Sequence, residues 1–152
     1  MLKKDQIPKV ELEEMNVVHY EEVELLITLL NRLDAVADGE LAPETIDTSL
    51  ETLIEHMRAH FAREEQQMVG AGFPAHPAHK AEHDRVLAEA RSIYDAWRSD
   101  RDERTLARYL ERTLPAWMIH HITTLDADAA RFLAARGPRR AGAGAATAET
   151  ET

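Results

Sequence analysis

The chain has 152 residues, a formal net charge of −10 and no cysteine. An acidic surface disfavours nucleic acid and anionic membranes as partners, and the lack of cysteine excludes disulfides, thiolate zinc sites and iron–sulfur clusters. Because no apolar run approaches the length of a membrane span and polar residues follow the basic start, we expect a cytoplasmic protein with no membrane partner.

Four amphipathic helices are predicted from the recurrence of apolar residues at helical spacing. In chain order we expect a polar arm over residues 1–8 and helices over residues 9–37, 43–69, 77–99 and from about 102 to 136. Short connections between such helices favour an all-α, up-down-up-down four-helix bundle. We therefore predict one bundle domain over residues 1–136, followed by a flexible tail over residues 137–152, whose composition offers few apolar anchors.

Pro115 lies inside the fourth predicted helix. Proline removes one backbone hydrogen bond and clashes with the preceding turn, so we expect a kink near Glu111 or a break there.

Histidines and acids recur along the chain at spacings that suit a helical metal site. Residues four apart on a helix lie on one face. Because the helices alternate in direction, positions late in the second helix, early in the third and late in the fourth fall at the same end of the bundle. A mixed set of imidazoles and carboxylates of this size indicates more than one ion. The candidate ligands are His19, His60, Glu64, His79, His83, His121 and Asp126.

From about residue 15 to residue 132, the chain resembles the hemerythrin family of non-haem di-iron proteins. The matching pieces are His60-Phe61 with Glu64-Glu65, His79-Lys80 with His83, and Trp117 with His121-Ile122 and Asp126. The resemblance implies two iron ions, Fe2+ or Fe3+, joined by an oxo or hydroxo group. It assigns His79, His83 and His121 to one iron, His19 and His60 to the other, and Glu64 and Asp126 to both, with O2 at the two-histidine iron.

His121 and Asp126 are five residues apart, which places them about 140° apart on a regular helix. Asp128, seven residues from His121, would share its face better but lies two turns away, and the resemblance selects Asp126 instead. For Asp126 to join the site, the helix must be irregular through Thr123-Thr124, and we predict a non-α turn there.

The chain departs from the family at positions around the expected ligand pocket. Glu22 stands where an aliphatic residue is usual, and it could act as an extra ligand, as a proton donor to bound peroxide, or simply belong to the solvated run over residues 21–24. Met118 replaces a usual leucine. Phe61 and Trp117 are expected first as core residues that keep the cofactor pocket dry.

Other polar residues have plainer interpretations. His56 shares the face of His60 and could be an outer donor, a substitute ligand or a surface histidine. We expect His76 to be solvated, His120 to face outward, and Glu65 and Glu82 to be exposed rather than ligating.

Three functions stay open at this point. The first is O2 binding, as a carrier, store or sensor. The second is a di-iron enzyme that uses Glu22 and acts on O2, peroxide or nitric oxide, with an electron donor as a further partner. The third, iron storage on the ferritin plan, ranks last because that plan uses Glu-x-x-His motifs and no histidine here has a glutamate three residues before it.

Overall fold

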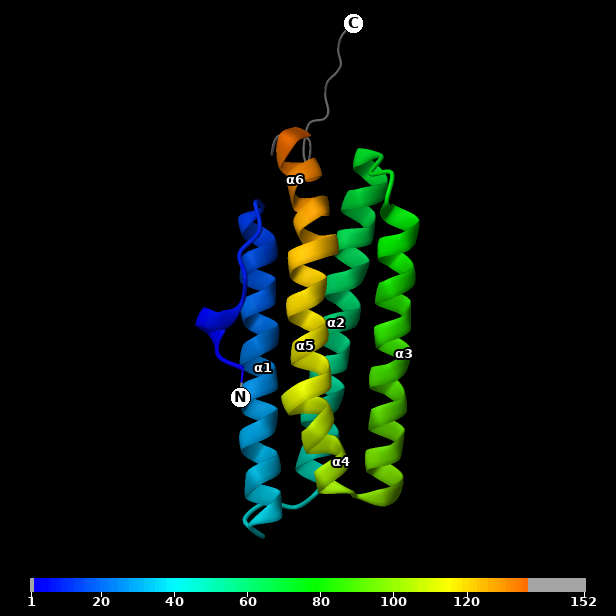
Figure 1. Cartoon of the computed structure of the whole chain (residues 1–152). Helices are drawn as coiled ribbons and strands as arrows, with labels where there is room; N and C mark the ends of the chain where they lie inside the picture. The colour runs from blue at the N-terminus through cyan, green and yellow to red at the C-terminus, as the bar shows by residue number, and fades with distance from the viewer. Residues whose placement is uncertain (1, 137–152) are drawn as a thin grey trace, which may run out of the picture.

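The computed structural model describes residues 2–136 and shows four long antiparallel helical rods without strands in that range (Figure 1). The first three rods are α1 (Glu13–Ala37), α2 (Glu44–Ala71) and α3 (His76–Asp100). The fourth is continuous and consists of α4 (Glu103–Arg108), η2 (Tyr109–Thr113), α5 (Leu114–His121), η3 (Ile122–Asp126) and α6 (Ala127–Arg136). The predicted all-α bundle is confirmed. The flexible tail predicted for residues 137–152 lies outside the described residues.

The first helix begins later than predicted, at Glu13 rather than near residue 9. The side chain of Asn16 explains the difference. Its amide oxygen accepts from the backbone N–H of Val10 at 2.9 Å and its amide nitrogen donates to the carbonyl of Val10 at 3.1 Å. This pairing satisfies both backbone groups of Val10 outside a helix, so the chain enters α1 from an extended segment.

The segment before α1 packs against the bundle, whereas a polar arm was predicted there. It contains a short 3-10 turn, η1 (Lys4–Gln6), and two of its apolar residues, Leu2 and Ile7, are buried against the bundle. Lys4 forms an exposed ion pair with Glu24 of α1 at 2.8 Å. Apolar burial therefore attaches this arm to the bundle, and the surface ion pair adds little.

Identifiable residues end and begin the other helices. Gly72 follows α2 in the left-handed region, with φ 71°, where glycine avoids the strain that a Cβ causes. Asp102 caps α4 by accepting from the backbone N–H groups of Arg104 and Thr105. The break predicted between the third and fourth helices is thus confirmed at Arg101 and Asp102.

Pro115 leaves the fourth rod continuous but irregular. The turn before it, η2, is a π-helical segment, and the N–H of Leu114 donates to the carbonyl of Tyr109, five residues back. A widened turn absorbs the hydrogen bond that proline cannot make, so the expected irregularity at Glu111 takes the form of a π turn rather than a break.

The candidate ligands form a polar layer between two apolar clusters. The larger cluster fills most of the bundle, and the smaller one consists of Met15, Met68, Ala129 and Ala130. Each of these four residues lies about one turn beyond a candidate ligand on its own helix. Within the described residues, no helix is both long and apolar enough to cross a bilayer.

The larger cluster is expected to dominate the stability of the fold. Leu29 is fully buried in it, so Leu29→Ala should lower the free energy of unfolding by about 2–5 kcal/mol through lost burial and a residual cavity. Urea unfolding of the metal-free protein measures this. Leu41→Ala, at an exposed loop leucine, serves as the control and should change the free energy of unfolding by less than about 0.5 kcal/mol.

Candidate metal centre

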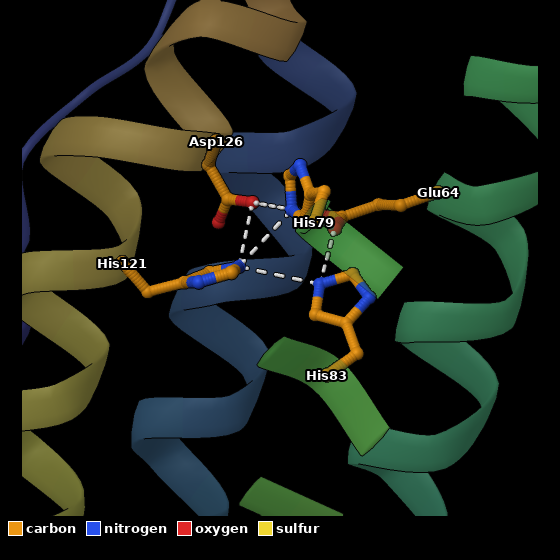
Figure 2. Close-up of side chains that lie close together, drawn as sticks. All are labelled: Glu64, His79, His83, His121 and Asp126. Atoms are coloured by element: carbon orange, nitrogen blue, oxygen red, sulfur yellow. Dashed lines mark hydrogen bonds and ion pairs between the residues drawn. The ribbon is translucent and has the colours of Figure 1, made fainter. Parts of the chain in front are cut away.

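All seven sequence-predicted ligands are buried, and their side chains converge from all four rods. His19 comes from α1, His60 and Glu64 from α2, His79 and His83 from α3, and His121 and Asp126 from the fourth rod. Figure 2 shows five of them pointing toward one another. The expectation that helix direction would bring these positions to one level of the bundle is met.

Their ligand atoms divide into two groups that share a residue. One group contains five residues whose ligand atoms all lie within 4.8 Å of one another, and the other contains three on the same criterion. Glu64 belongs to both. The larger group is Glu64, His79, His83, His121 and Asp126, and the smaller is His19, His60 and Glu64.

The two carboxylates lie between the groups and offer one oxygen to each side. In Glu64, Oε2 is 2.7 Å from Nε2 of His60, and Oε1 is 3.4 Å from Nε2 of His83. In Asp126, Oδ2 is 3.0 Å from Nε2 of His19, while Oδ1 is 3.0 Å from Nε2 of His79. This arrangement suits two ions that share two carboxylates.

Spacing of the donor atoms fits a metal ion better than a hydrogen-bonded network. Nε2 of His121 is 3.1 Å from Nε2 of His79 and 3.2 Å from Nε2 of His83. Two neutral imidazoles whose Nε2 lone pairs point at each other repel. By contrast, the nitrogen atoms of two ligands bound to one ion at metal–nitrogen distances of about 2.1 Å lie about 3.0–3.4 Å apart. Among the described residues, the buried Oε1 of Glu64 also has no hydrogen-bond partner. The residues present therefore fit the cations that the pattern implies.

The five-residue step from His121 to Asp126 is accommodated by the non-α turn that we predicted. The segment η3, Ile122–Asp126, is π-helical, and the N–H of Ala127 donates to the carbonyl of Ile122. Hydroxyl groups of Thr123 and Thr124 donate to the carbonyl of His120, at 3.1 and 2.7 Å. These bonds satisfy a carbonyl just before the widened turn, and the turn brings Asp126 round to the side of His121.

Aromatic rings cover the three-histidine side of the centre. Phe61 stacks on His83 with ring centroids 3.9 Å apart, and Trp117 stacks on His121 at 4.4 Å. The indole N–H of Trp117 donates to Glu82 at 2.7 Å, which fixes the tryptophan in place. Phe61 and Trp117 thus pack directly on candidate ligands. Met118 is buried in the larger apolar cluster.

Glu22 occupies a position different from the one suggested by the sequence. It is buried, but Oε2 contacts Nδ1 of His60, the ring nitrogen that faces away from Glu64, and Nδ1 of His56 at 3.2 Å. It belongs to neither group of ligand atoms in the described part of the chain. As placed, Glu22 lies behind a ligand rather than at an ion, and the solvated alternative is excluded by its burial.

A second outer carboxylate, Glu65, was expected to be exposed and instead contacts a candidate ligand. Oε2 of Glu65 is 2.9 Å from Nδ1 of His83 and is only partly exposed. The signal was present, since Glu65 directly follows a candidate ligand, but only the packing of α2 on α3 shows which histidine it reaches. His120 is exposed, as expected. His56 proves to be an outer residue that contacts Glu22 and, through Nε2, Glu21 at 3.3 Å.

Buried opposite charges shift the pKa values within the centre. Burial alone would raise the pKa of Glu22, but the rings of His60 and His56 outweigh it and lower the pKa to about 2. Burial would lower the pKa of His60, yet Glu22 and Glu64 raise it well above its usual value. Hydrogen bonds from His121, His19 and His79 hold the pKa of Asp126 well below its usual value, against the opposing effect of burial. With no ion bound, a proton on His60 therefore balances part of the acidic charge.

A cleft of about 530 Å³ lies between α1 and α2 and reaches the two-histidine side of the centre. Two candidate ligands, His60 and Glu64, contribute to its wall. The remaining lining residues are Glu14, Met15, Val17, Val18, Arg63 and Gln67. Small molecules can therefore approach the smaller ligand group, while aromatic rings cover the larger one.

An all-helical bundle with five imidazoles and two carboxylates gathered between its rods defines a class of helical-bundle metalloproteins with a two-ion centre. Comparison with known proteins then gives the family. Residues 12–133 match the model of the hemerythrin HHE cation binding domain, and the chain belongs to the hemerythrin family. This confirms the resemblance found in the sequence. At the level of the family, these are non-haem di-iron proteins that bind O2.

Similar curated proteins span most of the chain. A bacteriohemerythrin of Aquifex aeolicus (strain VF5) is 32% identical over 119 residues, covering 78% of this chain and 87% of the relative. A bacteriohemerythrin of Ralstonia nicotianae (strain ATCC BAA-1114 / GMI1000) is 38% identical over 111 residues, covering 73% and 76%. No solved structure gives a significant match.

Proposed function

We propose that this protein binds O2 reversibly, as a carrier, store or sensor, at a pair of iron ions that alternate between Fe2+ and Fe3+. In this proposal His79, His83 and His121 hold one ion, His19 and His60 hold the other, and Glu64 and Asp126 contact both. The observation that carries it is the orientation of the two carboxylates, each with one oxygen toward each histidine group.

The unequal ligand groups determine where O2 would bind. Three imidazoles and two carboxylates supply five protein atoms to one ion, whereas two imidazoles and the same carboxylates supply four to the other. The ion with fewer protein ligands is the one that the α1–α2 cleft reaches. Two ferrous ions, when bound, supply the electrons for reversible reduction of O2.

The chain's own residues supply position and exclusion of water. Phe61 and Trp117 cover the imidazole rings of the three-histidine group, which limits access of water and protons to that side. Glu22 and Glu65 each accept from the outer nitrogen of one ligand, which leaves Nε2 free to bind an ion. These contacts favour a stable, protected centre of the kind that reversible binding needs.

The test is optical and is made on the full chain loaded with Fe2+ under nitrogen. Exposure to O2 should give a coloured form with about one O2 bound per iron pair, and vacuum should remove the colour over repeated cycles. His19→Ala should abolish the cycle because it removes a ligand of the open ion, whereas His120→Ala, at an exposed neighbour of a ligand, should not. Rapid, irreversible passage to the ferric form would contradict reversible binding.

One observation favours the second function, a di-iron enzyme acting on O2, peroxide or nitric oxide with an electron donor. Contacts run without a gap from exposed Glu21 through His56 and Glu22 to His60. Such a line makes His60 a more basic ligand, which would stabilise the ferric state of the two-histidine ion and favour turnover. Steady consumption of added peroxide by the iron-loaded protein, with no lasting oxygenated form, is the result that would select this function.

A further inference from the structure

We propose that Glu22, held by His56, is a positioning residue for His60 and sets how tightly the two-histidine position binds its ion. The inference rests on the two-ion centre of the proposed function. It assigns this carboxylate to the outer nitrogen of a ligand, and it predicts that the two ion positions fill in order, the three-histidine position first.

The geometry at His60 separates its two ring nitrogens. Nε2 faces Glu64 at 2.7 Å, on the side of the centre, and Nδ1 contacts Oε2 of Glu22 on the opposite side. A carboxylate can only accept, so Nδ1 carries the hydrogen in this contact. Neutral His60 is thereby held in the tautomer whose Nε2 lone pair points at the ion, and its ring rotation is fixed.

His56 fixes Glu22 in turn. Its Nδ1 lies 3.2 Å from the same oxygen of Glu22, and its Nε2 lies 3.3 Å from Oε1 of Glu21. The side chain of His56 is 24% exposed, whereas that of Glu22 is 5% exposed. The carboxylate of Glu22 therefore lies between two imidazole rings of α2, in a position that packing alone would not hold.

The contact between His60 and Glu22 matters more to the smaller ligand group than the contact between His83 and Glu65 matters to the larger group. Of the two histidines in the smaller group, only His60 has a partner for its outer nitrogen, since the buried Nδ1 of His19 has none among the described residues. The larger group has its own outer carboxylate, Glu65 at His83, but it also has a third imidazole. Loss of Glu22 thus weakens a position that has fewer ligands to begin with.

Packing does not account for a carboxylate at this place. Glu22 lies one turn from His19 on the inner face of α1, next to fully buried Val23. Moving a carboxylate out of water is costly unless its partners compensate. An aliphatic side chain would fill the same volume without that cost, so the interaction with His60 and His56 explains the residue.

The experiment titrates metal-free protein with Zn2+, which binds the same kinds of ligand without redox chemistry. The full chain should bind two ions in two separable steps. Glu22→Leu should keep the first step unchanged and weaken the second about 10- to 100-fold, the usual cost of losing an outer partner of a metal-bound histidine. Glu22→Gln should fall between, because its amide oxygen still accepts from His60 but carries no charge.

Matched variants separate positioning from structure. Glu24→Leu, at an exposed acid of α1 paired only with Lys4 in the described residues, should bind zinc as the unmodified chain does. Glu65→Leu should weaken the first step rather than the second. Long-range proton–nitrogen spectra of the histidine rings, recorded at a pH high enough for His60 to be neutral, provide a readout independent of affinity: the zinc-free Glu22→Leu protein should lose the single tautomer at His60.

The outcomes are distinguishable. Two ions bound by Glu22→Leu with unmodified affinity, or equal weakening of both steps by Glu22→Leu, would overturn the positioning role. If Glu22→Gln, whose side chain has the same shape as that of glutamate, also weakened both steps equally, it would confirm that Glu22 has no positioning role. An unmodified chain that binds fewer than two ions would instead overturn the two-ion centre, and with it the proposed function.

Discussion

Replacing Asp126 with alanine is expected to destroy the two-ion centre. Its two oxygens are the shared contacts of His19 on one side and of His79 and His121 on the other. The variant should retain at most one iron per chain, and loss of an ion held at a thousand times its dissociation constant removes about 4 kcal/mol of stability. Iron analysis after anaerobic reconstitution and thermal unfolding of the loaded protein measure both effects.

Two further variants make this result specific. Asp126→Asn keeps the shape of the side chain but replaces one oxygen by an amide nitrogen, which cannot serve as a ligand, so it too should lose the shared centre. Asp128→Ala is the control, because Asp128 lies two residues further on and is exposed in an ion pair with Arg131. If Asp126→Ala binds two irons as tightly as the unmodified chain, the bridging assignment is wrong.

Acid is expected to release the ions, and the metal-free and loaded proteins should respond to pH in opposite directions. In the metal-free protein, the raised pKa of His60 contributes stability that is fully present below the usual value of about 6.5 and is lost as pH rises through the raised pKa. The loaded protein needs neutral His60, so below that raised pKa the ion must displace a proton from the ring. For each proton displaced, ion binding weakens by about tenfold per pH unit of acidification.

Glu22, the carboxylate next to His60, sets the lower pH limit of the metal-free protein's stability. Because the pKa of Glu22 is lowered to about 2, its contribution is present above its usual value of about 4.5 and is lost as pH falls through about 2. The metal-free protein should therefore be most stable between those two usual values, about pH 4.5 to 6.5. The stability advantage of the loaded protein should grow by about 1.4 kcal/mol per pH unit for each proton displaced.

Thermal unfolding of both forms at about pH 5 and about pH 8 tests this, together with calorimetric measurement of proton release on Zn2+ binding. His120→Asn should leave the pH response unchanged, since His120 is exposed outside the centre. An advantage of the loaded form that is the same at both pH values would show that no proton is displaced from the ligands.

Much of the centre could be predicted from the order of residues because helices impose a period. Four-residue spacing placed His60 with Glu64, and His79 with His83, on single helix faces. The five-residue step from His121 to Asp126 even predicted an irregular turn, and the structure has a π turn there. Boundaries were less accurate: α1 starts at Glu13 because the side chain of Asn16 binds the backbone of Val10, a contact that periodicity does not encode.

Outer contacts could not be predicted in the same way. Glu22, His56 and Glu65 all lie on predicted helices, and their spacing gave each of them several interpretations. The partner of each lies 18 or more residues away, on another helix. Which ring nitrogen a carboxylate reaches depends on the rotation of one helix against the next, and that rotation is set by packing of the whole core.

The amino-acid sequence by itself predicted the helices, the family and seven candidate ligands, from residue type, from spacing along each helix and from the resemblance to the family. Only the tertiary structure decided that Glu64 and Asp126 each turn one oxygen to either histidine group, that a cleft opens on the two-histidine side, and that Glu22 lies behind His60. The physical reason is that these features are distances between side chains on different rods, and these distances are fixed by the close packing of the rods.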